Sequence, residues 1–216
     1  MLVFFVSSNL ISRIGKVRRR RIESTFEKSS RRDALQVISN GGVAGVITLL
    51  WLFTHHESLY IGYLGAVAAA TADTWGTEIG VLSSAPPSLI TTFERVEPGT
   101  SGAVSFLGFS GSVVGCVTIF LSALFWLDQM VGVAAFSILL GGIIGAVIDS
   151  ALGSTFQLQY KCNVCNKLTE RETHCGMKGC FSSGFEWMRN DQVNLICTIS
   201  GCVASLVLWQ LLASEG

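Results

Sequence analysis

Apolar positions form long runs along this chain, and short polar segments separate them. Runs of about 20 apolar residues predict helices that cross a lipid bilayer. The sequence predicts five full spans, at Ala34–Phe53, Leu59–Leu82, Ser101–Trp126, Gly132–Phe156 and Gln192–Leu212. The apolar stretch Leu2–Ile11 is too short to cross. We expect it to be the end of a further, partly present span, with an interfacial helix as the alternative.

Charged residues are rare and segregated, which fixes the class of protein. They make up 14% of the 216 residues, against about 25% in a soluble domain. All fifteen Lys and Arg lie outside the apolar runs, with nine in 13–32, one at Arg95 and five in 161–189. By the positive-inside rule these segments face the cytoplasm. The sequence therefore predicts an all-α, polytopic integral membrane bundle, and a multi-pass membrane location.

Four parts follow from this pattern. Residues 1–33 would hold the partial first span and a basic cytoplasmic loop, and 34–156 a four-span core with acidic motifs. Residues 157–190 would form a cytoplasmic loop rich in Cys and His, here called the cysteine loop, and 191–216 the last span.

Three carboxylates interrupt the apolar runs. Asp73 and Glu78 lie in the second full span, within Ala70–Gly80, and Asp149 lies in the fourth. A carboxylate at the centre of a membrane helix costs about 2.5–3.5 kcal/mol on insertion scales. Something must compensate these charges, and a divalent cation with a phosphate ligand is the favoured candidate. We predict that Asp73 and Asp149 hold Mg²⁺, and that Glu78 contributes to the site.

The predicted topology places several polar residues at one depth. From the rise of a helix, Asp73 lies about 14 Å and Asp149 about 11 Å from the cytoplasmic end of its span. Asn40 and Asn194 fall in the same half of the bilayer, so we expect all four to line one site that a cytosolic nucleotide can reach. On a regular helix Glu78 points about 140° away from Asp73. Either the helix breaks between them, or only one of the two faces the site.

A glycine-rich loop precedes the third full span. Gly99, Thr100, Ser101 and Gly102, here called the glycine loop, offer backbone amides and hydroxyls. We expect them at a helix N-terminus, where anions bind, and we expect Arg95 nearby to contact nucleotide phosphates. A helix cap with turn glycines is the alternative. Carboxylates for Mg²⁺ beside amides for phosphate are the groups that phosphoryl transfer needs.

The cysteine loop carries a compact metal-ligand pattern. Cys162-x₂-Cys165 is followed by His174-Cys175 and then Cys180. A reducing compartment disfavours disulfides and favours zinc. We predict a structural zinc at Cys162, Cys165 and Cys175, with His174 or Cys180 as the fourth ligand. Cysteines without a metal are the alternative.

These motifs together resemble the transmembrane protein 19 family, which includes the plant phytyl-phosphate kinase of vitamin E synthesis. The matching stretches are Gln36–Gly42, Ala72–Gly80, Leu89–Val96, Pro98–Gly102, Gly145–Gln157 and Asn190–Asn194. The resemblance covers the chain from about residue 3. It implies an integral membrane kinase that converts an isoprenoid monophosphate to the diphosphate with a nucleoside triphosphate.

The hypothesis from sequence is therefore an isoprenoid-phosphate kinase that works in the lipid bilayer on an isoprenoid lipid. The expected catalytic residues are Asp73, Glu78, Asp149 and Asn194, and the expected nucleotide-binding residues are Asn40, Arg95 and the glycine loop. An ion-coupled transporter and a scaffold without enzymatic activity are the alternatives. Nucleic-acid binding is not predicted, because the basic residues lack interleaved aromatic side chains.

Overall fold

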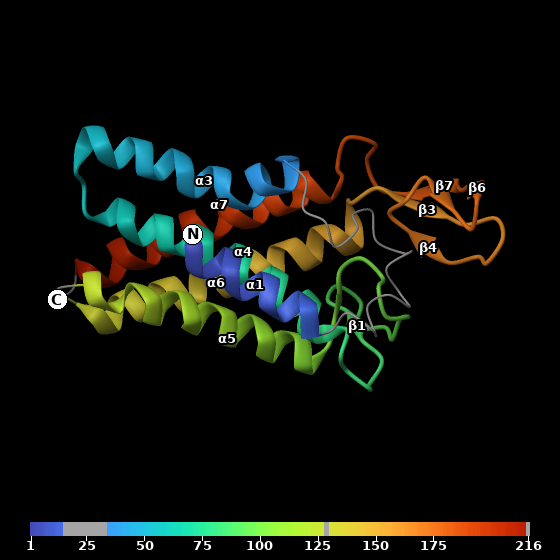
Figure 1. Ribbon diagram of the computed structural model, residues 1–216, viewed down its shortest axis with the longest axis horizontal. Helices are drawn as coiled ribbons and strands as arrows, with labels where there is room; N and C mark the ends of the chain where they lie inside the picture. Colours follow the sequence, from blue (N-terminus) through green and yellow to red (C-terminus); the bar gives the residue numbers. More distant parts are fainter. Residues whose placement is uncertain (15–33, 128–129, 215–216) are drawn as a thin grey trace.

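The predicted apolar runs form helices that lie side by side along the length of the molecule (Figure 1). The computed structural model describes residues 1–14, 34–127 and 130–214 and is mostly helical. The long helices are α3 (Ala34–Thr54), α4 (Ser58–Gly80), α5 (Phe106–Ala123), α6 (Val131–Thr155) and α7 (Asn190–Ala213). A shorter helix, α1 (Leu2–Ile14), packs against α4 and α5, and a 3₁₀ turn, η1 (Leu124–Trp126), extends α5.

Helix α4 lies in the centre of the bundle, packed against α3, α5, α6 and α7. Its residues 66–70 are four alanines and a valine, each at most 1% exposed. Small side chains let neighbouring backbones approach closely, which is how helices associate in lipid. Because the other helices surround it, α4 can carry polar residues with little contact with lipid.

Four of the described helices are long and apolar enough to cross a membrane. They are Ala34–Thr54, Phe106–Trp126, Val131–Thr155 and Asn190–Ala213. Helix α4 is long enough, but the threonines and carboxylates of its second half make it less apolar. The membrane bundle is thus supported, and the fifth full span stays a prediction. The basic segment predicted for 13–32 lies, from residue 15 onward, outside the described residues.

All the described strands gather at one end of the bundle (Figure 1), where they depart from an all-α fold. Between α4 and α5, β1 (Ser88–Leu89) pairs antiparallel with β2 (Ala103–Val104). Between α6 and α7, the cysteine loop forms a sheet of β4 (Leu168–Thr169), β3 (Gln159–Lys161) and β7 (Cys180–Ser183), in that spatial order. It also forms a hairpin of β5 (Thr173–His174) and β6 (Met177–Lys178).

Hydrogen bonds fix where the strand end meets the helices. The N–H of Leu158 donates to the carbonyl of Met188 at 2.8 Å, and both side chains are buried. This bond closes the base of the cysteine loop between α6 and α7. Helix α7 then begins with a capping box, in which Gln192 Oε1 accepts from the backbone N–H of Arg189 at 3.1 Å.

Close packing of α4 on α7 predicts which glycines tolerate a methyl group. A Cβ at Gly201 would lie 2.5 Å from the Ala69 Cβ and 2.8 Å from the carbonyl oxygen of Gly65, whereas a Cβ at Gly45 would meet nothing within 4 Å. We expect Gly201→Ala to destabilise the protein by about 1–3 kcal/mol, the usual cost of overpacking. Gly45→Ala is the matched control and should leave stability unchanged or slightly higher. Thermal unfolding in detergent measures both, and equal midpoints for the two variants would contradict this packing.

Candidate functional site

A cavity of about 220 Å³ lies at the strand end of the bundle, and residues from α3, α4, α5, α6 and α7 line it. Nine residues predicted for the site line this one cavity. They are Asn40, Asp73, Glu78, Gly99, Thr100, Ser101, Gly102, Asp149 and Asn194. Asn40, Asp73, Asp149 and Asn194, which the sequence predicts at one depth, thus meet in this cavity although they come from four different helices.

Asp73 on α4 and Asp149 on α6 face each other, with their carboxyl groups within hydrogen-bonding reach. The Oδ2 atom of Asp149 is buried and has no hydrogen-bond partner among the described residues. Two carboxylates so close repel each other when both are ionised. A bound cation or a shared proton would relieve this repulsion.

Glu78 reaches the same cavity although it points away from Asp73. Helix α4 continues to Gly80 without a break, and Gly76 serves instead to pack closely against Ser112 of α5. Glu78 is 6% exposed, and its Oε1 accepts a hydrogen bond from the Ser12 hydroxyl of α1 at 2.9 Å. The cavity therefore extends around α4, and neither a helix break nor the exclusion of one carboxylate is needed.

The glycine loop lines the cavity, but its predicted position at a helix N-terminus is wrong. Helix α5 begins only at Phe106, where the Ser105 Oγ caps it by accepting from the Gly108 N–H at 3.0 Å. Strand β2 lies in between because it pairs with β1. Gly102 has a φ of 73°, a left-handed conformation that favours glycine, and it packs on the Ser150 backbone without room for a Cβ. Helix α6, not α5, therefore supports this loop.

Glu170 is a fourth carboxylate of the site, and it was not predicted from the sequence. It follows β4 in the cysteine loop, is 8% exposed and lines the cavity. Its Oε1 accepts a hydrogen bond from the Ser101 hydroxyl at 2.6 Å. Its negative charge lies close enough to Asp73 and Asp149 to repel their carboxylates. The only signal in the sequence was its position between the two pairs of predicted zinc ligands.

The remaining polar predictions have different outcomes. Asn40 on α3 and Asn194 on α7 line the cavity, and Asn194 is 6% exposed. Arg95 does not line it: its side chain is exposed, and its backbone forms a β-bridge to Ser88 of β1. The structure thus brings both asparagines to the carboxylates and leaves Arg95 outside.

One side of the cavity is apolar. Its apolar lining includes Ile143, Ala146 and Val147 of α6 and Phe109 of α5. Val147 is 38% and Phe109 43% exposed, so this lining continues onto the outer surface of the helices. In a membrane bundle that surface faces lipid.

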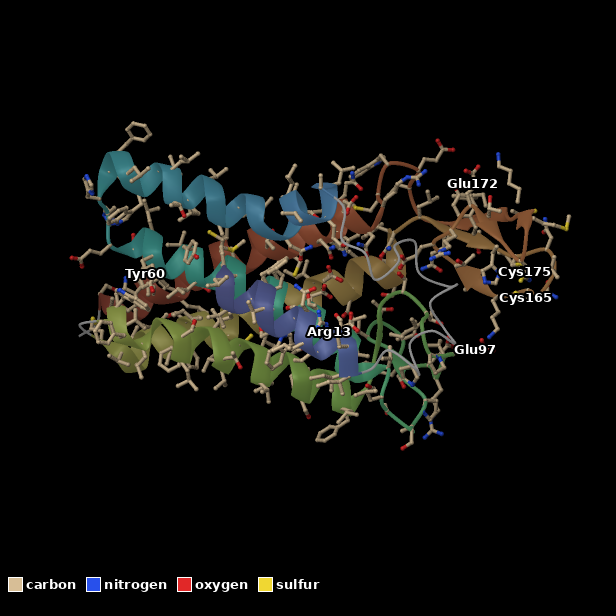
Figure 2. All side chains as sticks on the ribbon, viewed as in Figure 1. Arg13, Tyr60, Glu97, Cys165, Glu172 and Cys175 are labelled. Carbon is tan, nitrogen blue, oxygen red and sulfur yellow. The ribbon has the colours of Figure 1, made fainter. Side chains whose placement is uncertain are left out.

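The predicted zinc ligands meet at the outer tip of the cysteine loop, where Figure 2 shows Cys165 and Cys175 close together. The ligand atoms of Cys162, Cys165, His174 and Cys175, here called the Cys/His cluster, all lie within 4.8 Å of one another. The His174 Nδ1 is 3.5 Å from the Cys165 Sγ and 3.3 Å from the Cys175 Sγ. Tetrahedral zinc, with bonds of about 2.0–2.3 Å, needs ligands at such separations. The donor set therefore fits zinc.

Cys180, the other candidate for the fourth ligand, lies outside the Cys/His cluster. Its Sγ donates a hydrogen bond to Asn163 Oδ1 at 3.3 Å. The arrangement therefore favours His174 as the fourth ligand. The backbone N–H of Cys165 and the His174 side chain lower the pKa of the Cys162 thiol to about 6. At neutral pH this favours the thiolate, the form that binds metals.

Comparison with known proteins now gives a family. The family described as integral membrane protein DUF92 matches residues 1–202. This chain belongs to that family. The match confirms the resemblance drawn from the motifs.

Proteins with similar sequences occur in plants, archaea and cyanobacteria. Protein PGR of Arabidopsis thaliana is 33% identical over 91% of this chain and 75% of its own length. The uncharacterized membrane protein MJ0933 of Methanocaldococcus jannaschii is 31% identical over 97% of this chain and 74% of its own. Protein VTE6, chloroplastic, of Arabidopsis thaliana is 24% identical over 97% of this chain and 57% of its own. No solved structure matches this chain.

Because Asp73 and Asp149 are in contact, removing the charge of one of them should stabilise the protein when no cation is bound. Asp149→Asn should raise the stability of the protein without divalent cations, because the new amide can donate to the Asp73 carboxylate. Hydrogen bonds to charged groups contribute about 1.5–3 kcal/mol. The same variant should lose any thermal stabilisation by Mg²⁺. Glu57→Gln, at the exposed opposite end of α4, is the matched control and should change neither quantity. Thermal unfolding with and without Mg²⁺ measures both effects, and an Mg²⁺ response that persists in Asp149→Asn would exclude this carboxylate as a ligand.

Proposed function

We propose that this protein transfers a phosphoryl group from a nucleoside triphosphate to an isoprenoid monophosphate, giving the isoprenoid diphosphate. The observation that carries the proposal is the convergence of Asp73, Asp149 and Glu170 beside the glycine loop, in one cavity at the end of a membrane bundle. The acceptor class comes from the family, whose member VTE6 is a phytyl-phosphate kinase. At 24% identity, that relative supports the chemistry and leaves the chain length of the isoprenoid open.

Asp73 and Asp149 are the residues that would hold Mg²⁺. The described side chains that line the cavity offer only oxygen atoms as metal ligands, and Mg²⁺ prefers oxygen ligands. The buried Asp149 Oδ2 has no hydrogen-bond partner among the described residues and is free to bind a cation. Bound Mg²⁺ would neutralise charge on the phosphates. Glu78, in the same cavity, adds negative charge on the other side of α4.

The glycine loop, Gly99 to Gly102, would hold phosphate groups through backbone amides, since its Thr100 and Ser101 hydroxyls donate to the Glu97 carbonyl and to Glu170. Its position is fixed from two sides, because Gly102 packs on α6 and the Ser101 hydroxyl donates to Glu170. Asn40 and Asn194 place side-chain amides across the same cavity. Fixed donors of this kind bind phosphate without reorganising during the reaction.

The reaction needs little covalent chemistry from the protein. The bond between the γ-phosphorus and the bridging oxygen of the triphosphate breaks, and a monophosphate oxygen forms the new bond to that phosphorus. The nucleoside diphosphate leaves with the bridging oxygen. The acceptor oxygen already carries negative charge, so no side chain has to remove a proton. Positioning and charge neutralisation would then supply most of the rate enhancement.

The apolar side of the cavity would take the isoprenoid chain. Ile143, Ala146 and Val147 lead from the carboxylates to the outer surface of α6, where lipid lies in a membrane. A lipid monophosphate could therefore place its phosphate in the cavity while its chain stays between the helices and the bilayer.

A direct assay tests the proposal and its catalytic residues. Purified protein in lipid nanodiscs is incubated with farnesyl, geranylgeranyl or phytyl monophosphate and a γ-labelled nucleoside triphosphate. We expect label in the isoprenoid diphosphate. Asp73→Asn should reduce turnover by about 100-fold or more, since the charge that neutralises the phosphates is lost. Glu57→Gln should retain the activity.

Other outcomes of this experiment point to other functions. Flux of ions across proteoliposomes without nucleotide, with no labelled diphosphate, would indicate a transporter. Absence of Mg²⁺-dependent nucleotide binding, together with an Asp73→Asn variant that behaves as the wild type, would indicate a scaffold.

A further inference from the structure

We infer that zinc bound by the Cys/His cluster holds Glu170 in place at the cavity, so that the cysteine loop supplies part of the site. The inference has two steps. The first is that the cysteine loop depends on a metal for its structure, and it stands without the proposed function. The second is that this structure positions Glu170, and its functional meaning rests on the proposed function.

The cysteine loop has almost no hydrophobic core of its own. Within the described segment 159–183, Cys162 is the only buried apolar side chain. The larger apolar side chains of this segment, Val164, Leu168, Met177 and Phe181, are 41–59% exposed. Its strands have two to four residues each. Units of this size need a metal, a disulfide or another staple to be stable.

Two tight turns bring the four ligands into position. Around the first pair, the Cys162 N–H donates to the Lys167 carbonyl at 2.9 Å, and the Asn166 N–H donates to the Cys162 carbonyl at 3.0 Å. In the second pair, His174 ends β5, and Cys175, with a φ of 53°, begins the two-residue turn Cys175–Gly176 that leads to β6. Four sulfur and nitrogen donors from two adjacent turns make a closed site, as in structural zinc sites.

The chain between the two turns carries Glu170. Cys165 and His174 stand at its two ends, so a metal that binds both tethers the segment between them at both ends. Two exposed ion pairs involve this segment, one between Lys167 and Glu97 at 2.9 Å and one between Glu172 and Lys178 at 2.8 Å. Exposed ion pairs contribute only about 0–1 kcal/mol. A metal that binds both ends would therefore restrain the segment more strongly than these ion pairs do.

Glu170 links the zinc site to the cavity. It accepts a hydrogen bond from Ser101 of the glycine loop at 2.6 Å, and its negative charge interacts with the Asp73 and Asp149 carboxylates. Loss of the metal should therefore release Glu170, remove one negative charge from the cavity and leave Gln157 Oε1, 3.1 Å away, as the acceptor for the Ser101 hydroxyl. Glu170 is in this account a positioning residue, which acts on bound cations and phosphates through its neighbours.

The first measurement is the zinc content of the full-length protein, purified in detergent, by mass spectrometry of the metal. We expect about one zinc per chain in the wild type, and less than a tenth of that in Cys165→Ser and Cys175→Ser. Cys180→Ser is the matched control, because Cys180 lies in the same loop but outside the cluster, and it should retain the metal. Absence of zinc from the wild type, even after incubation with Zn²⁺, or equal loss in Cys180→Ser, would overturn the metal site.

The second measurement asks whether the zinc site acts through Glu170. Mn²⁺ binding to the cavity, followed by electron paramagnetic resonance, should weaken about tenfold or more in Glu170→Gln, as for residues that support metal ligands. Cys165→Ser should weaken it by the same factor, and the double variant should be no worse than either single variant, since both changes remove one interaction. Cys180→Ser should bind Mn²⁺ as the wild type does.

Folding of each variant is checked by size-exclusion chromatography. A zinc-selective chelator, added to the folded wild type, gives a test that needs no mutation and should also weaken Mn²⁺ binding. Zinc loss with unchanged Mn²⁺ affinity would overturn the coupling. Additive effects in the double variant would do the same. If the coupling is found but the wild type transfers no phosphoryl group, the proposed function fails and the inference stands.

Discussion

The contact between the Asp73 and Asp149 carboxyl groups is the constraint on which the rest of the structure depends. Each of these charges would be costly in lipid. The central position of α4, packed by alanines and glycines against its neighbours, keeps Asp73 away from lipid and turns it toward Asp149 on α6. The same close packing gathers α3, α5 and α7 around the pair.

Around this pair the protein combines parts with different physical origins. Long apolar runs form the helices, which suit a lipid environment. The glycine loop takes its shape from the left-handed backbone of Gly102, which packs closely on α6. The cysteine loop has little core and gains its shape from short hairpins that gather sulfur and imidazole donors. Glu170 belongs to this last part but lies against the first two. The helices, the glycine loop and the cysteine loop therefore all contribute residues to the cavity.

Much of this arrangement follows from the sequence, and the exceptions have physical reasons. The apolar runs predicted the long helices, and the helical rise placed Asp73, Asp149, Asn40 and Asn194 at one level, where they line one cavity. Periodicity cannot say which helix is central, because all five long helices consist mainly of apolar residues. It also cannot foresee that β2 pairs with β1 and moves the start of α5 to Phe106. Glu170 was missed because only the fold of the cysteine loop brings it to Ser101.

The central claim is that Asp73 and Asp149 share a cation beside a phosphate site, and anomalous diffraction tests it most directly. Crystals of the protein grown with Mn²⁺ and a non-hydrolysable nucleoside triphosphate would locate both groups. The account predicts an anomalous peak between these two carboxylates, with phosphate density against the glycine loop. Carboxyl groups that bond only to each other, with the manganese peak elsewhere or absent, would contradict it.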